Sequence, residues 1–348
     1  MSANDIDLVQ LSTFLGEYIP GFGGPLSASK TSFGQSNPTY FLSNEAGDEI
    51  VLRRKPFGEL LPSAHAIDRE YRVMQALAAT PVPVPQMLVY CDDASIIGAE
   101  FFCMEKIVGR TALLPTLDDP GWDPASRGAV FEHMADVLAA LHSVDVSAVG
   151  LGDYGKPGNY FERQLGRWTK QYRASETTRI EPMEELMAWL SANMMDDAAV
   201  PSLVHGDYRI DNLILDPADP KIVAVVDWEL STLGHPLADL GQVLMQWLLP
   251  PNAQGRGLMG IDRKALGLPS NGAFVRRYAA ARRLSDVPDL TFPIAFSFFR
   301  MGGILQGVYK RGLEGNASDP KQAAAMGAFV PQLAKGALQV INQRQKST

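Results

Sequence analysis

The 348-residue sequence has few cysteines, no long apolar segment and no excess of positive charge. Its two cysteines, Cys91 and Cys103, lie in segments that read as strands, and they indicate buried thiols in a reducing compartment. No apolar run approaches the ~20 residues of a transmembrane helix. The first residues have neither the basic flank nor the apolar core of a signal peptide. We therefore predict a cytoplasmic protein that does not enter a membrane.

The formal net charge of −8 and the pI of about 5.2 argue against a nucleic-acid-binding protein. The charge is unevenly distributed along the chain. The first 271 residues hold 20 basic and 35 acidic side chains, whereas residues 272–348 hold 11 basic and 4 acidic ones. A basic C-terminal part suits an anionic ligand, because arginine binds phosphate through two hydrogen bonds. The alternative is a set of solvated helix faces.

Several chemistries lack their sequence signals. The His, Cys and acidic residues follow no zinc-binding spacing, and no serine has the context of a nucleophile elbow. The sequence also has no repeats and no low-complexity segment, and the turn at residues 34–38 has a single glycine and no Gly-x-Gly-x-x-Gly motif.

The strongest functional signal lies between residues 203 and 227. An apolar run leads into His205-Gly206-Asp207, Asn212 follows, and two further apolar strands end at Asp227. Asp207 suits orienting a hydroxyl group and accepting its proton, whereas Asn212 and Asp227 suit holding Mg²⁺ on a nucleotide. The alternative is a β-hairpin with solvated Asp and Asn at its turns. That alternative does not explain the kinase-like spacing of the acid and the amide.

A basic strand end precedes a helix with an acid in its apolar stripe. Alternation along residues 50–55 places Arg53 and Lys55 on one face, where a cation can clamp phosphates. The next predicted helix, capped by Ser63, has Glu70 among its apolar residues. A buried carboxylate requires a cation. We predict that Arg53 pairs with Glu70, and Lys55 remains a competing phosphate clamp.

Two further segments are candidates for backbone contacts with a nucleotide. The first is a turn of mostly small residues between predicted strands, which contains Gly34, Gln35, Ser36 and Asn37. Such a turn can place its N–H groups over phosphates. The alternative is an ordinary hairpin turn. The chain leaves the β-rich region at a segment that can hydrogen-bond an adenine edge and contains Met104, Glu105 and Ile107. The change in composition there predicts lobes of residues 1–105 and 106–348.

Two residues are candidates for supporting the Asp207 turn. His205 belongs to the turn itself. Asp239 starts a predicted helix, so it either caps that helix or accepts backbone N–H bonds from the turn, or does both. His142 lies on an apolar helical stripe and is expected to be a hydrogen-bonded core histidine.

Together these motifs resemble the aminoglycoside phosphotransferase family, the small-molecule branch of the protein-kinase-like fold. The resemblance runs in order from Gly34 to at least Gly241, and it is carried by His205-Gly206-Asp207 with Asn212, by Asp227-Trp228-Glu229 and by Pro236-Leu237-Ala238-Asp239-Leu240-Gly241. Residues 34–40 and 52–56 look like a subgroup whose kinase-like domain is fused, in some proteins, to an acyl-CoA dehydrogenase. A dehydrogenase activity is not implied.

The resemblance implies an α+β, two-lobed protein-kinase-like fold, with a β-rich N-terminal lobe, a mostly helical C-terminal lobe and Mg²⁺ with ATP or GTP between them. It makes Asp207 the catalytic base, and it makes Asn212 and Asp227 the metal ligands. Arg53 takes the place of the phosphate-clamping lysine of protein kinases, and Glu70 that of its carboxylate partner. The segment from Met104 to Ile107 corresponds to the hinge.

The acceptor is predicted to be a hydroxyl group on a small anionic metabolite. Aminoglycosides are polycations that call for acids in the C-terminal helices, which are basic here. The fused relatives suggest a hydroxyacyl-CoA, with Arg209, Arg282 and Arg283 as candidate substrate-binding residues. The alternatives are a choline- or homoserine-kinase-like enzyme, an aminoglycoside kinase, and a nucleotide-binding pseudokinase with a regulatory role.

Overall fold

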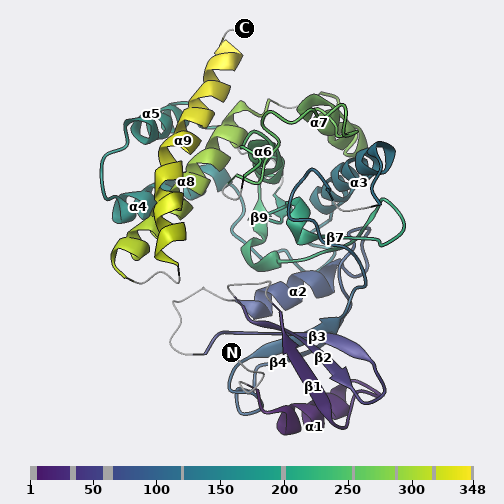
Figure 1. Cartoon of the computed structure of the whole chain (residues 1–348). Coiled ribbons are helices and arrows are strands. Elements are labelled where there is room, and N and C mark those ends of the chain that lie inside the picture. Colours follow the sequence, from purple (N-terminus) through teal and green to yellow (C-terminus); the bar gives the residue numbers. More distant parts are fainter. Residues whose placement is uncertain are drawn as a thin grey trace. The chain divides into compact units, whose positions relative to one another are not determined.

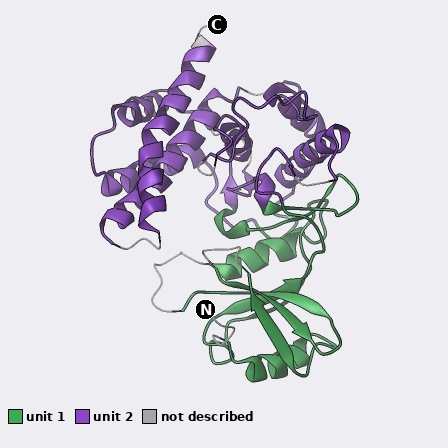
Figure 2. Ribbon diagram, in the orientation of Figure 1, with its two compact units in different colours: residues 1–111, 147–151, 212–231 green, residues 112–146, 152–211, 232–348 purple. Residues whose placement is uncertain are grey.

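The computed structural model describes residues 6–31, 37–57, 66–118, 121–196, 201–252, 255–286, 289–315 and 319–345. The chain divides into two compact units (Figure 2). The first comprises residues 1–111, 147–151 and 212–231, and the second comprises residues 112–146, 152–211 and 232–348. The sequence predicted a first lobe of residues 1–105 only. Residues 212–231 join the first unit because the backbone groups of Leu215 pair with those of Arg110, and Val225 N donates to Pro83 O at 2.8 Å.

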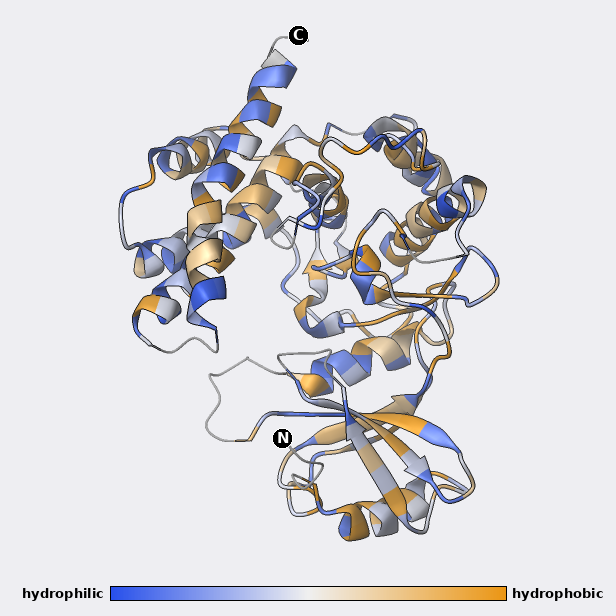
Figure 3. Ribbon diagram, viewed as in Figure 1, coloured by the Kyte–Doolittle hydropathy of each residue, from blue (hydrophilic) through white to orange (hydrophobic). Residues whose placement is uncertain are grey.

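A five-stranded antiparallel sheet forms the core of the first unit (Figure 1). Its strands run in the order β1-β2-β3-β5-β4, with bounds β1 Leu26–Lys30, β2 Thr39–Asn44, β3 Glu49–Arg54, β4 Met87–Cys91 and β5 Phe101–Glu105. Helix α1 (Leu8–Tyr18) begins after Asp7, whose carboxylate accepts hydrogen bonds from two N–H groups of the first turn. Its Leu11 and Leu15 are buried in one apolar cluster with residues of β2 and β3. Figure 3 shows hydrophobic residues along these strands.

Helix α2 (Ile67–Leu77) and a short hairpin complete the first unit. Helix α2 packs against β4 and β5. The hairpin pairs β7 (Leu213–Leu215) with β8 (Ile222–Val225), and a 3₁₀ turn, η3 (Trp228–Leu230), follows and contacts α2. Trp228 is fully buried, and its indole N–H donates to Val225 O at 2.9 Å. This anchor fixes the course of the chain on both sides of Asp227.

Among the residues that the structure describes, the regular elements of the second unit are helices and one pair of short strands. Its helices are α3 Pro124–His142, α4 Tyr160–Ser175, α5 Glu181–Ala192, α6 Leu237–Trp247, α7 Asn271–Ala281, α8 Thr291–Leu313 and α9 Pro320–Gln345. Helix α8 contacts α4, α5, α6 and α9, and it carries many apolar residues (Figure 3). Across the described ranges, every helix falls short of the length and apolar character that crossing a bilayer demands.

The strand pair of the second unit positions the segment around Asp207. Strand β6 (Ser202–Val204) pairs antiparallel with β9 (Thr232–Gly234), a pairing that the sequence did not predict. Strand β6 contacts α3, and the Ser202 hydroxyl donates to His142 O at 3.1 Å. The chain therefore leaves a fixed strand directly into His205.

Candidate active site

A buried carboxylate holds the turn that follows β6. Asp239, in the first turn of α6, is 1% exposed. Its Oδ2 accepts a hydrogen bond from His205 N at 2.7 Å, and its Oδ1 accepts one from Gly206 N at 2.8 Å. Gly206 has a φ of +81°, which favours glycine. Burial by itself would raise the pKa of Asp239, but the hydrogen bonds from the His142 side chain and from the His205 backbone N–H lower it. This is the bracing geometry that the sequence predicted for Asp239.

His142 lies behind this brace. Its Nε2 is 3.2 Å from Asp239 Oδ2, and its Nδ1 is 2.8 Å from the Tyr278 hydroxyl. Burial lowers the pKa of His142, so the ring is neutral. A neutral ring satisfies both partners when Nε2–H donates to Asp239 and Nδ1 accepts from Tyr278. The prediction of a hydrogen-bonded core histidine is confirmed.

The Asp207 carboxylate is hydrogen-bonded by a side-chain amide of α6, the helix that also carries Asp239. Asp207 Oδ1 accepts a hydrogen bond from Gln242 Nε2 at 2.6 Å and lies 3.5 Å from Arg209 Nε. Gln242 follows Asp239 by three residues, so α6 presents both side chains on one face. The sequence analysis did not identify Gln242. Its position three residues after Asp239 on a predicted helix is the sequence feature that could have identified it.

The predicted metal ligands, Asn212 and Asp227, meet at the end of the β7–β8 hairpin in the first unit. Leu213 pairs with Val225, and Val226 N donates to Asn212 O at 3.0 Å. Asp227 has a φ of +66°, a strained conformation of the kind that clusters at functional sites. Within the described ranges no three His, Cys, Asp or Glu side chains are arranged to hold a metal ion. Amide and carboxylate oxygens are the ligand types that suit a Mg²⁺ whose other ligands are waters and phosphates.

Arg53, at the end of β3, joins two acids of the first unit. Its Nε lies 2.9 Å from Glu70 Oε2, and its Nη2 lies 2.9 Å from Asp227 Oδ1. The predicted Arg53–Glu70 pair is present, and both residues are buried. Glu229, which the sequence did not single out as a partner, is 3.8 Å from Arg53 Nη2. The guanidinium group thus reaches both the helix α2 acid and a metal-ligand candidate.

Lys55, the competing phosphate clamp, has a different partner. Its ammonium group lies 2.6 Å from a carboxylate oxygen of Glu100. Both groups are partly exposed, so Lys55 is engaged at the edge of the sheet while Arg53 contacts Asp227. The geometry favours Arg53 as the cation of the predicted nucleotide site.

The remaining predicted nucleotide contacts are only partly described. Of the predicted phosphate turn, Asn37 is buried; Gly34, Gln35 and Ser36 lie outside the described residues, as does Ser63. Of the predicted hinge, Met104 is buried and Ile107 half-buried, and Glu105 N donates to Gln86 O at 2.9 Å. This hydrogen bond fixes the end of β5 where the chain leaves the sheet.

Glu70 makes a prediction about pH. Burial raises its pKa to about 7, although the charge of Arg53 opposes the rise. The folded protein therefore binds a proton that the unfolded chain releases near pH 4.5, and the stability linked to Glu70 falls as pH rises through about 7. Between pH 5 and pH 8 the wild type should lose on the order of 2 kcal/mol relative to Glu70→Gln. Urea unfolding of both proteins at each pH measures this difference, and parallel curves would refute it.

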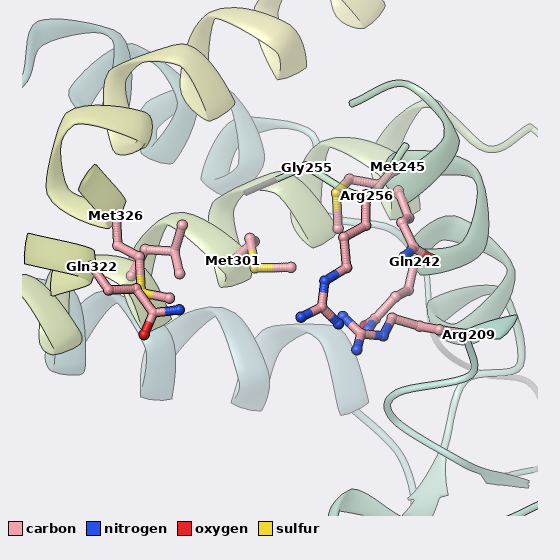
Figure 4. Close-up of a pocket in the computed structure, with 10 residues that line it drawn as sticks. Arg209, Gln242, Met245, Gly255, Arg256, Met301, Gln322 and Met326 are labelled. Atoms are coloured by element: carbon pink, nitrogen blue, oxygen red, sulfur yellow. The ribbon is translucent and has the colours of Figure 1, made fainter. Parts of the chain in front are cut away.

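A cavity of about 240 Å³ lies beside the Asp207 turn in the second unit (Figure 4). Arg209 and Arg256 occupy one end, where Arg209 Nη2 and Arg256 Nη1 lie 2.5 Å and 3.0 Å from Asp211 Oδ2. Figure 4 shows the two guanidinium groups side by side, Met301 in the middle, and Met326 at the opposite end. The cavity therefore combines a cationic end near the acid with a remainder lined by methionine, leucine and glutamine side chains.

Arg256 is held in this position by a tight backbone turn. It has a φ of +47°, which is costly for a residue with a side chain. A Cβ on Gly255 would lie 2.4 Å from Pro250 O, and one on Gly257 would lie 2.1 Å from Leu249 O. The flanking positions therefore accept only glycine, and 42% of the Arg256 side chain stays exposed. Strain of this kind is typical of ligand-binding residues.

Two of the three candidate substrate residues lie elsewhere. Arg209 lines the cavity. Arg282 and Arg283 do not line it: Arg282 donates to His142 O at 2.6 Å, and Arg283 is exposed at the end of α7. Counting charges along the sequence could not show on which side of the helices the cations lie. The structure instead brings Arg256 beside Arg209.

A comparison with protein families decides the assignment. The family model described as "Phosphotransferase enzyme family" matches residues 28–281. The chain belongs to this phosphotransferase family. Acyl-CoA dehydrogenase family member 10 of Mus musculus is 46% identical over 85% of the chain and 27% of its own length. Family member 11 of Rattus norvegicus is 40% identical over 98% of the chain and 44% of its own length. The chain thus spans less than half of these curated relatives.

Solved structures confirm the predicted family and the kinase-like fold. A candidate aminoglycoside phosphotransferase from Ralstonia eutropha superposes with a TM-score of 0.87 at 44% identity, covering 97% of this chain and 99% of that one. A complex of APH(4)-Ia with AMP-PNP and hygromycin B has a TM-score of 0.60 at 16% identity, covering 95% and 98% of the two chains, and agrees in fold. The chain is therefore a member of a phosphotransferase family and has a β-rich unit and a helical unit.

Proposed function

We propose that this phosphotransferase moves the γ-phosphoryl group of Mg²⁺·ATP to a hydroxyl group of a small anionic molecule. The observation that carries the proposal is a braced acid, Asp207, five residues before Asn212, whose backbone pairs beside Asp227. An acid that accepts a proton and oxygen ligands for Mg²⁺ are the parts that phosphoryl transfer needs. The AMP-PNP bound to the APH(4)-Ia neighbour supports an ATP-type donor.

Each proposed residue has one task. Asp207 orients the acceptor hydroxyl and accepts its proton. Asn212 and Asp227 would hold Mg²⁺, which neutralises charge on the β- and γ-phosphate oxygens when bound. Arg53, oriented by Glu70, clamps the phosphates, because a guanidinium group stays charged and offers two parallel donors.

The backbone would supply the other nucleotide contacts. The Gly34–Asn37 turn would place N–H groups over the phosphates. Met104, Glu105 and Ile107 would hydrogen-bond the adenine edge through their main chain. These contacts would belong to a nucleotide-binding lobe of residues 1–105, and residues 106–348 would form the catalytic and substrate-binding lobe.

The cavity supports an acceptor that has an anionic group and an apolar part. Asp211 contacts both Arg209 and Arg256, and Arg209 also lies 3.5 Å from Asp207, whereas 42% of the Arg256 side chain stays exposed and can offer further donors to an anionic group. Met301 and Met326 are flexible apolar side chains that adapt to an aliphatic segment. A hydroxyacyl-CoA meets both requirements, and the names of the curated relatives support a CoA-linked acceptor.

The direct test measures ADP release from Mg²⁺·ATP and Mg²⁺·GTP with a panel of acceptors. The panel contains 3- and 4-hydroxyacyl-CoAs, choline, homoserine and kanamycin, with Asp207→Ala as the blank. Turnover with a hydroxyacyl-CoA alone supports the complete proposal. Turnover with choline or kanamycin keeps the chemistry and removes the anionic acceptor. Nucleotide binding without any turnover favours a pseudokinase with a regulatory role.

Arg256 provides a prediction about the acceptor. Arg256→Ala should raise the acceptor KM about 10- to 100-fold, because a hydrogen bond to a charged group contributes ~1.5–3 kcal/mol. The KM for ATP should stay unchanged. Arg277→Ala is the matched control, because Arg277 pairs with Asp136 at 2.6 Å and does not line the cavity. Equal acceptor KM values in the two variants would exclude Arg256 from acceptor binding.

A further inference from the structure

The structure assigns Gln242 and Arg300 to a relay that positions the proton-accepting carboxylate of Asp207. The inference rests on the proposed function, in which Asp207 is the catalytic base. Gln242 donates from Nε2 to Asp207 Oδ1 at 2.6 Å, and its Oε1 accepts from Arg300 Nη1 at 3.0 Å. The relay thus runs from α8 through α6 to the reacting acid.

The hydrogen bonds fix the orientation of the Gln242 amide. A guanidinium group has donors only, so the side it faces must be the amide oxygen. The amide N–H₂ is then directed at Asp207. Gln242 is 7% exposed, so most of its side chain is shielded from competing water.

Arg300 connects the relay to the main chain of the same turn. The nitrogen that contacts Gln242 also donates to Gly206 O at 2.8 Å. The N–H of Gly206 is bound by Asp239, so its peptide groups are held from two sides. The Asp207 carboxylate and the backbone that carries it are consequently held by one cation.

Gln242 is a different kind of partner from Arg209, the cation that faces the same carboxylate. Arg209 Nε lies 3.5 Å from Asp207 Oδ1. Gln242 adds an oriented hydrogen bond to that oxygen without a second cation, and the charge of Arg300, one side chain removed, polarises the amide between them. The relay therefore fixes the orientation of the carboxylate through a neutral donor.

A purely structural reading would have Gln242 and Arg300 tie α6 to α8. The two readings differ in what the amide N–H₂ does, because its partner here is the reacting carboxylate and not a helix residue. They predict different effects on the pH–rate profile, and that profile is the test.

The experiment compares variants of the full chain in ADP release from Mg²⁺·ATP with a hydroxyacyl-CoA. Gln242→Leu should lower kcat about 10- to 100-fold, the usual cost of losing a partner that orients a reacting group. The affinity for ATP should not change. Gln242→Glu keeps the acceptor for Arg300 but places a second carboxylate at Asp207, so the acidic limb of the pH–rate profile should move up by about one pH unit.

Arg300→Gln should lower kcat by a smaller factor than Gln242→Leu does, and its effect should shrink in the Gln242→Leu background. Gln246→Leu is the matched comparison, because Gln246 lies one turn further along α6, is also buried and lines the same cavity. Gln246→Leu should alter at most the acceptor KM, and it should leave the pH–rate profile in place.

The outcomes separate this inference from the proposed function. If Asp207→Ala abolishes turnover and Gln242→Glu keeps the wild-type pH–rate profile, the relay is overturned and the function stands. If Gln242→Leu loses activity only in proportion to its folded fraction, the relay is likewise overturned. A wild type that releases no ADP with any acceptor removes both.

Discussion

Asp207→Asn should lower kcat by a factor of about 100 to 10,000, the range that a positioned general base contributes. An amide cannot accept the proton of the acceptor hydroxyl, although it has the shape of the carboxylate and can still accept the hydrogen bond from Gln242. Isothermal titration with Mg²⁺·ATP should give the same affinity for wild type and variant, because Asp207 is proposed to act on the acceptor.

Asp216→Asn is the matched control for this substitution. Asp216 lies in the turn of the following hairpin, where its carboxylate accepts N–H bonds from Ala218 and Asp219. It should retain wild-type turnover. Full turnover of Asp207→Asn would mean that the base lies elsewhere, and weakened nucleotide binding would mean that Asp207 has a structural role.

Local sequence patterns were sufficient for much of the first unit. The apolar periodicity that predicted a helix around Glu70 also predicted its burial, and a buried acid requires a cation. Strands β6 and β9 are different, because each has only three residues. A segment that short carries no periodicity, and its pairing depends on what the rest of the chain brings beside it.

The residues of the candidate site likewise differ in whether a local sequence pattern could point to them. Asp207, Asn212, Asp227 and Asp239 could be proposed from the sequence because each belongs to a local motif. Gln242, Arg256 and Arg300 were not predictable as a group, because contacts between α6, α8 and a distant turn bring them together.

Arg282 and Arg283, two of the predicted substrate residues, do not line the cavity beside Arg209. The charge count selected Arg282 and Arg283, but a count of charges along the sequence does not show which way each side chain points. In the structure Arg282 donates to a main-chain carbonyl at the end of α3. The cations beside the acid come from separate loops and helices, which no local count can find.

Asp227→Asn should lower the affinity for ATP when Mg²⁺ is present but not when the metal is absent. Removing the negative charge takes away the only anionic ligand among the two proposed for Mg²⁺, so the affinity for Mg²⁺·ATP should fall about 10- to 100-fold, the cost of a disturbed metal site. Asparagine is the right replacement because it tolerates the left-handed backbone, with a φ of +66°, whereas alanine would add strain.

Without metal the same substitution should leave ATP affinity unchanged or increase it. Arg53 Nη2 contacts Asp227 Oδ1 at 2.9 Å, so in the wild type the phosphate clamp is engaged by the residue that is to hold the metal. Neutralising Asp227 releases that nitrogen for a phosphate, while Glu70 still orients the guanidinium group through Nε. Titrations with ATP in Mg²⁺ and in EDTA measure both effects on one protein. A uniform loss of affinity under both conditions would show that Asp227 supports the fold of the site and does not bind the metal.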